Sequence, residues 1–251
     1  MCIRDRYTDD PSTTGLITTD TVAVRYMLQR ALKAGVQVEI HAIGDRGNRL
    51  TLDLFEAAFN SVPVAERKIA EPRWRVEHAQ IVAPSDLPRF KSLGLIASMQ
   101  PSHAIGDLFF VPSRIGVART SGAYAWESFL KMGVPVAGGT DAIPCNPMMN
   151  VWSLVTRRDR VTSRPVGKHG SLSVPEAIKV MTTAGARLTF EEDCKGPLVP
   201  GNRADIAFLA RDPLRVDIDE LPDIKCEATL SGGEFVYGNV SRDTPEPRDS
   251  I

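Results

Sequence analysis

Two histidines and an aspartate are the residues of this sequence best placed to do chemistry. In parallel α/β proteins the carboxyl ends of the strands meet on one face, and catalytic groups collect there. His41, His78 and Asp141 each end a short apolar segment typical of a buried strand: VQVEIH (36–41), WRVEH (74–78) and VPVAGGTD (134–141). Two imidazoles and a carboxylate are suitable ligands for a divalent cation such as Zn²⁺. The pattern therefore predicts a divalent metal site, most readily for Zn²⁺, in a hydrolase.

Helical patterns alternate with the strand-like segments. The predicted strands cover residues 36–41, 74–79, 95–100 and 134–139, and the predicted helices cover about 20–34, 46–60, 85–93, 122–132, 147–158 and 173–188. A long loop is expected between the third strand and the helix at 122–132. The segment SVPE (173–176) predicts a capping box at the start of the last helix. Four strand–helix units in succession predict an α/β fold with a parallel sheet.

The character of the sequence changes after Leu188. Residues 203–210 and 228–238 have β patterns, and Gly232-Gly233 predicts a hairpin within the second of them. We therefore predict an α/β unit over 7–194, a β-rich portion over 195–240 and a disordered polar tail over 241–251. The first six residues, MCIRDR, carry no pattern that continues into the rest, so we treat 1–6 as a possible non-native scar and leave them out of the fold prediction.

Composition excludes several classes of protein. The 251 residues are 43% hydrophobic and 24% charged, and 30 basic against 31 acidic residues give a net charge of −1. This balance predicts a soluble protein that binds neither nucleic acid nor an anionic membrane surface. The four cysteines lie far apart without a CxxC pair, which fits a reducing compartment. With neither a membrane-spanning apolar run nor a signal-peptide core, the predicted location is the cytoplasm.

Five motifs in order carry a resemblance to a known family. They are HAIGDRG (41–47), RVEHAQIV (75–82), SMQPSHA (98–104), GGTDA (138–142) and the closing GNRADIAFLARDPL…TLSGGEFVYG. Together they resemble the carboxyl-terminal half of the amidohydrolase superfamily, amidohydrolase-3 type, which includes formamide-deformylase-like enzymes. The resemblance covers residues 7–240. It implies the second half of a metal-dependent hydrolase (β/α)₈ barrel, about four βα units, plus part of a composite β-sandwich built from both chain ends.

The resemblance also implies roles for individual residues. His41, His78 and Asp141 would hold one or two divalent metal ions, most readily Zn²⁺. Asp141 would in addition be catalytic, taking a proton from a metal-activated water and passing it to the leaving nitrogen. His103 would polarise the substrate carbonyl. The implied substrate is a small molecule with a non-peptide, amide-type carbon–nitrogen bond.

The sequence also departs from the superfamily pattern. Members carry a His-x-His pair on their first barrel strand, whereas the histidines here are His41, His78, His103 and His169, with no such pair. We therefore expect an incomplete copy of the enzyme whose open sheet edges favour self-association. Two alternatives to an active hydrolase stay open, namely an inactive half-barrel remnant and a scaffold that binds a metal or a small ligand. His103 could also simply cap a loop.

Overall fold

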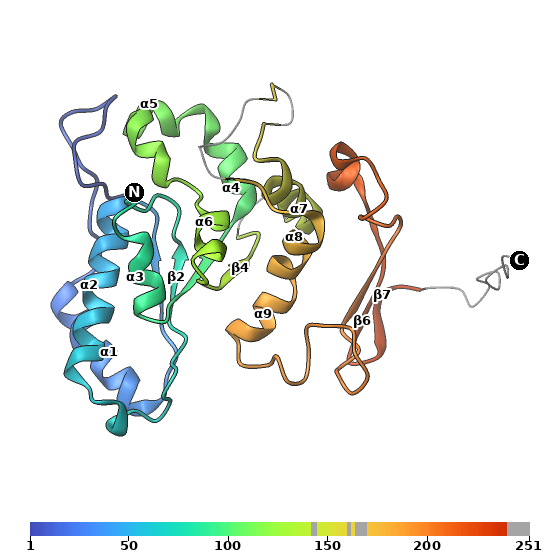
Figure 1. Cartoon of the computed structure of the whole chain (residues 1–251), viewed down its shortest axis with the longest axis horizontal. Helices are drawn as coiled ribbons and strands as arrows, with labels where there is room; N and C mark the ends of the chain where they lie inside the picture. The colour runs from blue at the N-terminus through green and yellow to red at the C-terminus, as the bar shows by residue number, and fades with distance from the viewer. Residues whose placement is uncertain (142–144, 160–161, 164–169, 240–251) are drawn as a thin grey trace, which may run out of the picture.

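A four-stranded parallel sheet forms the centre of the molecule (Figure 1). The computed structural model describes residues 1–141, 145–159, 162–163 and 170–239. The strands are β1 (Glu39–Ala42), β2 (Arg75–His78), β3 (Ile96–Met99) and β4 (Val136–Gly138), and they lie side by side in the order β1-β2-β3-β4. Each strand falls within or one residue beyond its predicted segment. The prediction of an α/β fold with a parallel sheet is therefore confirmed.

Helices follow the strands as the alternating pattern predicts. They are α1 (Thr21–Ala34), α2 (Asp45–Ser61), the short 3₁₀ helix η1 (Val64–Glu66), α3 (Leu87–Ser92), α6 (Trp126–Lys131) and α7 (Pro147–Thr156). The helix expected over 173–188 is instead two helices, α8 (Val174–Met181) and α9 (Thr183–Leu188). The helical conformation is interrupted at Thr182, whose φ of −131° and ψ of −82° lie outside the helical region. The predicted capping box between Ser173 and Glu176 is present.

The segment between β3 and α6, predicted as a loop, contains four short helical pieces. These are α4 (Pro101–Gly106), η2 (Asp107–Phe109), α5 (Val111–Ile115) and η3 (Val117–Gly122). A proline stands in the first turn of both α4 and α5, where its missing N–H costs no helical hydrogen bond. Pieces of three to six residues are too short to show a helical repeat of apolar positions, which explains why the sequence pattern indicates only a loop.

The hydrophobic core lies between the sheet and the helices, and Figure 1 shows α1, α2 and α3 together beside β1 and β2. Val76 of β2, Ala97 of β3 and Val136 of β4 are buried in this core. The neighbouring positions Arg75 and Glu77 are only half-buried and face the other way, since successive side chains of a strand point to opposite faces. On that face Arg75 forms an ion pair with Glu39 of β1.

A second, antiparallel sheet contains β5 (Ile206–Leu209), β6 (Cys226–Ser231) and β7 (Glu234–Gly238) in that order. The short 3₁₀ helix η4 (Ile218–Asp223) precedes β6. The hairpin predicted about Gly232 and Gly233 is present, and their φ values of 60° and 90° are those that favour glycine. In Figure 1 this sheet lies on the far side of α7, α8 and α9 from the parallel sheet.

The first residues of the chain, predicted as a possible non-native scar, pack against the loop after β1. Ile3 is 1% exposed, and its N–H donates to the carbonyl of Thr14. The carbonyl of Cys2 accepts from the N–H of Gly47 at the start of α2. The predicted disordered tail at 241–251 lies outside the described residues, and so does His169.

Candidate metal centre

The four candidate side chains come from consecutive βα units. His41 lies in β1, His78 ends β2, His103 lies in α4 just after β3, and Asp141 follows β4. In the pairing of β1 with β2, Ala42 lies opposite His78, so these two strands end at the same level. All four residues therefore reach the carboxyl edge of the parallel sheet, where the sequence predicts the site.

Three of these side chains are close enough to bind one ion. Asp141 Oδ2 lies 3.9 Å from His78 Nε2 and 4.0 Å from His103 Nε2. One ligand atom from each of the three residues lies within 4.8 Å of the others. Atoms bonded to one tetrahedral Zn²⁺ lie about 3.4 Å apart, given metal–ligand bonds of about 2.1 Å. Small side-chain movements would therefore let the three share a cation.

His41 lies beside this triplet. Its ring centroid is 4.5 Å from that of His78, with the two rings at 76°, while the rings of His78 and His103 are 5.8 Å apart at 21°. Unlike His78, His41 is exposed, and it lines a largely apolar groove of about 780 Å³ between β1 and α1. Of the three ligands expected from the sequence, His78 and Asp141 belong to the close triplet. The third ligand atom of the triplet comes from His103, for which the sequence predicts only a role in polarising the substrate carbonyl.

The main chain at the site adopts an uncommon conformation. His78 has a φ of 72°, Ala79 one of 43° and Asp141 one of 54°. Residues other than glycine seldom have positive φ, and such positions concentrate at functional sites because the surrounding structure must hold them there. Here the left-handed residues lie where β2 and β4 end. They turn the chain sharply just where His78 and Asp141 project from the sheet edge.

Burial favours the neutral form of the His78 imidazole. The side chain is 7% exposed, and its pKa lies below the ordinary 6.5 because of burial first and the charge of His41 second, against the opposing effect of Asp141. The neutral imidazole is the form that binds metals. Among the described residues, buried His78 Nδ1 has no hydrogen-bond partner, and neither has Oε1 of Gln100. The Gln100 side chain lies close enough to His78 to raise its pKa, against the larger effect of burial. The donor set of His78, His103 and Asp141 fits a divalent cation.

A buried polar cluster that the sequence does not reveal lies next to His103. The Asp107 carboxylate accepts hydrogen bonds from the Tyr124 hydroxyl and from the Gln80 amide, which also donates to Tyr124 at 3.0 Å. Burial raises the pKa of Asp107, and the nearby His103 partly opposes that effect. Burial also holds the pKa of Tyr124 well above 10.0. Asp107 and Tyr124 lie in the segment between β3 and α6, which has no periodic pattern.

The glycines before Asp141 serve packing and leave room at the site. A Cβ on Gly138 would collide with Met181 Sδ and would lie 3.1 Å from Val180 Cγ1, both on α8. A Cβ on Gly139 would meet nothing closer than Gln100 Nε2 at 4.0 Å. Gly138 therefore allows α8 to pack closely against β4, while Gly139 keeps open space beside the candidate ligands.

A parallel sheet with two histidines and an aspartate converging at its carboxyl edge has the arrangement of a metal-dependent hydrolase. The model of the amidohydrolase family matches residues 2–237, so the chain belongs to that family. Among curated proteins it is similar to YtcJ of Bacillus subtilis, with 28% identity over 94% of this chain and 44% of the relative. It is also similar to the N-substituted formamide deformylase of Arthrobacter pascens, with 26% identity over 83% of this chain and 38% of the relative.

Solved structures agree with this assignment. A metal-dependent hydrolase from Pyrococcus horikoshii is 29% identical with a TM-score of 0.73, covering 86% of this chain and 42% of that protein. The chain thus spans about two fifths of the length of the relatives that it matches. In the part of the chain that the structure describes, every helix is too short or too polar to cross a membrane.

Proposed function

We propose that this chain carries part of the active site of a metal-dependent hydrolase that cleaves amide-type, non-peptide carbon–nitrogen bonds in small molecules. The observation that carries the proposal is the convergence of His78, His103 and Asp141, whose ligand atoms lie within 4.8 Å of one another. The similarity to a relative named N-substituted formamide deformylase supports the choice of bond. Imidazole and carboxylate ligands favour Zn²⁺ as the cation.

The proposed roles follow from exposure and position. A divalent cation at this site would polarise a carbonyl oxygen and make water a stronger acid. Asp141, which is 47% exposed, is accessible to water and accepts the proton that the attacking water loses, then delivers it to the leaving nitrogen. His78, buried and neutral, serves as a ligand. His103 is 25% exposed and faces the same carboxylate, so it can bind the cation or orient the substrate carbonyl. His41 completes the donor set beside His78.

The parallel sheet is, in this proposal, the second half of a (β/α)₈ barrel, and the antiparallel sheet is one portion of a composite β-sandwich. Among the described residues, no strand pairs with the outer edge of β1. We propose that residues 1–251 alone show little or no hydrolysis, because the family draws further ligands from a His-x-His strand that this sequence lacks. The second candidate function is an inactive half-barrel or a metal-binding scaffold. It is favoured by the same missing His-x-His pair. The proposed location is the cytoplasm.

An assay with matched variants tests this function. The Zn²⁺-loaded chain and an extended version that restores the amino-terminal half of the barrel are incubated with an N-substituted formamide. We expect turnover only from the extended version. There Asp141→Asn should abolish turnover while much of the metal stays bound, because the amide cannot take the proton. Asp193→Asn makes the same chemical change at an exposed position outside the site and should leave turnover intact. Turnover by residues 1–251 alone that survives Asp141→Asn would refute the proposal.

A further inference from the structure

The side chain of Asn48, in the first turn of α2, donates hydrogen bonds to four main-chain carbonyl groups. It is 0% exposed, although asparagine is an ordinary surface residue. Its Nδ2 lies within hydrogen-bonding distance of the carbonyl oxygens of Ala42, Ile43, Gly44 and Ile81, at 3.0, 3.2, 3.0 and 3.1 Å. An amide has two N–H donors, so these four acceptors share them.

The four carbonyls belong to the end of β1 and to the loops that follow β1 and β2, the two strands that carry His41 and His78. Ala42 directly follows His41, and Ile81 lies three residues after His78. The parallel pairing of β1 with β2 ends at Ala42 and His78. Beyond that point the N–H of Ile81 donates to the carbonyl of Ile43 at 2.8 Å. The Asn48 amide therefore reinforces the link between the two loops just after the histidines.

The position uses asparagine as a donor. Asn48 Oδ1 is buried and finds no hydrogen-bond partner in the described part of the chain, so the hydrogen bonds seen for this amide are those of Nδ2. Buried main-chain carbonyls need a donor, and an apolar side chain at position 48 would leave some of these four without one. The loops after β1 and β2 would then be held by the main-chain bond from Ile81 to Ile43 without the added Asn48 contacts.

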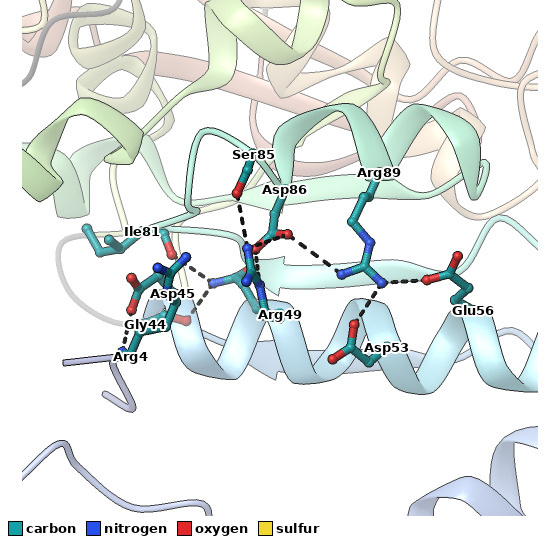
Figure 2. Close-up of polar contacts among 11 residues, drawn as sticks. Arg4, Gly44, Asp45, Arg49, Asp53, Glu56, Ile81, Ser85, Asp86 and Arg89 are labelled. Carbon is teal, nitrogen blue, oxygen red and sulfur yellow. Dashed lines mark hydrogen bonds and ion pairs between the residues drawn. The ribbon is translucent and has the colours of Figure 1, made fainter.

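The rest of the same helical turn is fixed to its surroundings (Figure 2). Asp45 Oδ1 accepts from the N–H of Arg4 at 2.9 Å. Arg49 donates to both carboxylate oxygens of Asp86, at 2.8 and 2.9 Å, and to Ser85 Oγ at 3.1 Å. The start of α2 is thus a fixed support, and the carbonyls that Asn48 holds are fixed with it.

We propose that Asn48 is a positioning residue that sets the separation of His41 and His78. The inference rests on the proposed function, because that separation decides whether both imidazoles can serve one metal centre. The Asn48 amide donates to main-chain carbonyls beside the two histidines. It acts through the main chain that carries them, and so differs from a residue that merely fills the core.

The test compares Asn48→Ala with Leu52→Val, a change one turn further along α2 at a residue that is also 0% exposed. In the metal-free chain, the nuclear Overhauser effect between the His41 and His78 rings reports their separation directly, since the centroids are 4.5 Å apart. Isothermal titration with Zn²⁺ then measures metal affinity. We expect Asn48→Ala to weaken the ring-to-ring effect and to lower Zn²⁺ affinity by about 10- to 100-fold, as for other residues that orient ligands. Leu52→Val should change neither.

An unchanged ring-to-ring effect together with wild-type affinity in folded Asn48→Ala would overturn the inference. If Asn48→Ala does not fold, Asn48→Ser replaces it, since serine keeps one donor in a smaller side chain. Its ring-to-ring effect should be weaker than that of the wild type, and an equal effect would overturn the inference. If the wild-type chain binds no Zn²⁺, the proposed function fails, while the metal-free ring-to-ring comparison still decides the role of Asn48.

Discussion

The ion pair between Arg49 and Asp86 joins α2 to the start of α3, and removing the arginine should measurably destabilise the fold. The Asp86 side chain is 3% exposed and receives two hydrogen bonds from Arg49 (Figure 2). The change Arg49→Met keeps the apolar stem and removes the charge. The carboxylate then stays buried with Arg89, 3.7 Å away, as its remaining cation.

The expected loss follows from the burial of the two partners. Removing one member of a fully buried ion pair costs about 3–5 kcal/mol, because the other charge is left uncompensated. Arg49 is 38% exposed, so solvent already screens part of the pair, and Arg89 compensates another part. We therefore expect Arg49→Met to lower the free energy of unfolding by about 2 kcal/mol. For a chain of this size that corresponds to a fall in Tm of about 4–8 °C.

Urea and thermal unfolding followed by circular dichroism test this value. The control is Arg46→Met, three residues earlier in α2. Arg46 is exposed, and its side chain forms a long hydrogen bond of 3.4 Å to Thr14. This control should change the free energy of unfolding by no more than about 0.5 kcal/mol. The double variant Arg49→Met/Asp86→Leu should be more stable than Arg49→Met, because no buried charge remains. Equal losses for Arg49→Met and Arg46→Met, or a double variant less stable than Arg49→Met, would refute the reasoning.

Three further predictions concern packing, protonation and association. Gly138→Ala should cost about 1–3 kcal/mol in urea unfolding because its Cβ collides with Met181, whereas Gly139→Ala should be nearly neutral; equal costs would contradict this. Burial holds the pKa of His78 below the ordinary 6.5, so more than half of the imidazole should be neutral at pH 6.5 and free of the proton that would compete with the metal. A midpoint above 6.5 in an NMR titration of the metal-free chain would contradict this. Met27 lies beside the outer edge of β1, so Met27→Lys places a charge next to this open edge and should reduce self-association in sedimentation experiments. A wild-type chain that is monomeric at every concentration would contradict the predicted self-association.

The strands were predictable because local pattern and fold agree there. Each is a short apolar segment between turn signals. Residues of β2, β3 and β4 are buried against the helices, whereas β1 buries only Ala42 fully. The helix pattern was less reliable over 173–188, where one apolar stripe continues across the break at Thr182. A break set by the φ and ψ angles of one threonine has no signature in the order of apolar residues. The short helices between β3 and α6 escaped prediction for the same kind of reason, since their length hides any period.

The candidate site was predictable to the level of the sheet edge. The rule that parallel strands present their carboxyl ends on one face places His41, His78 and Asp141 together. The rule does not give distances, so it could not show that His103 approaches Asp141 as closely as His78 does. Asn48 has no sequence signal at all, because a polar residue in the first turn of a helix is ordinarily exposed. Its role depends on the main-chain groups that the fold brings around it.

Zinc binding by the purified 251-residue chain tests the central claim most directly. Elemental analysis and isothermal titration would compare the wild type with His78→Ala and with Cys194→Ser, which removes an exposed thiol outside the site. We predict that the wild type and Cys194→Ser bind Zn²⁺ equally, and that His78→Ala loses the metal because its buried ligand is gone. A wild-type chain that binds no Zn²⁺, or a His78→Ala chain that binds it as tightly as the wild type, would contradict the claim that His78, His103 and Asp141 form a metal centre.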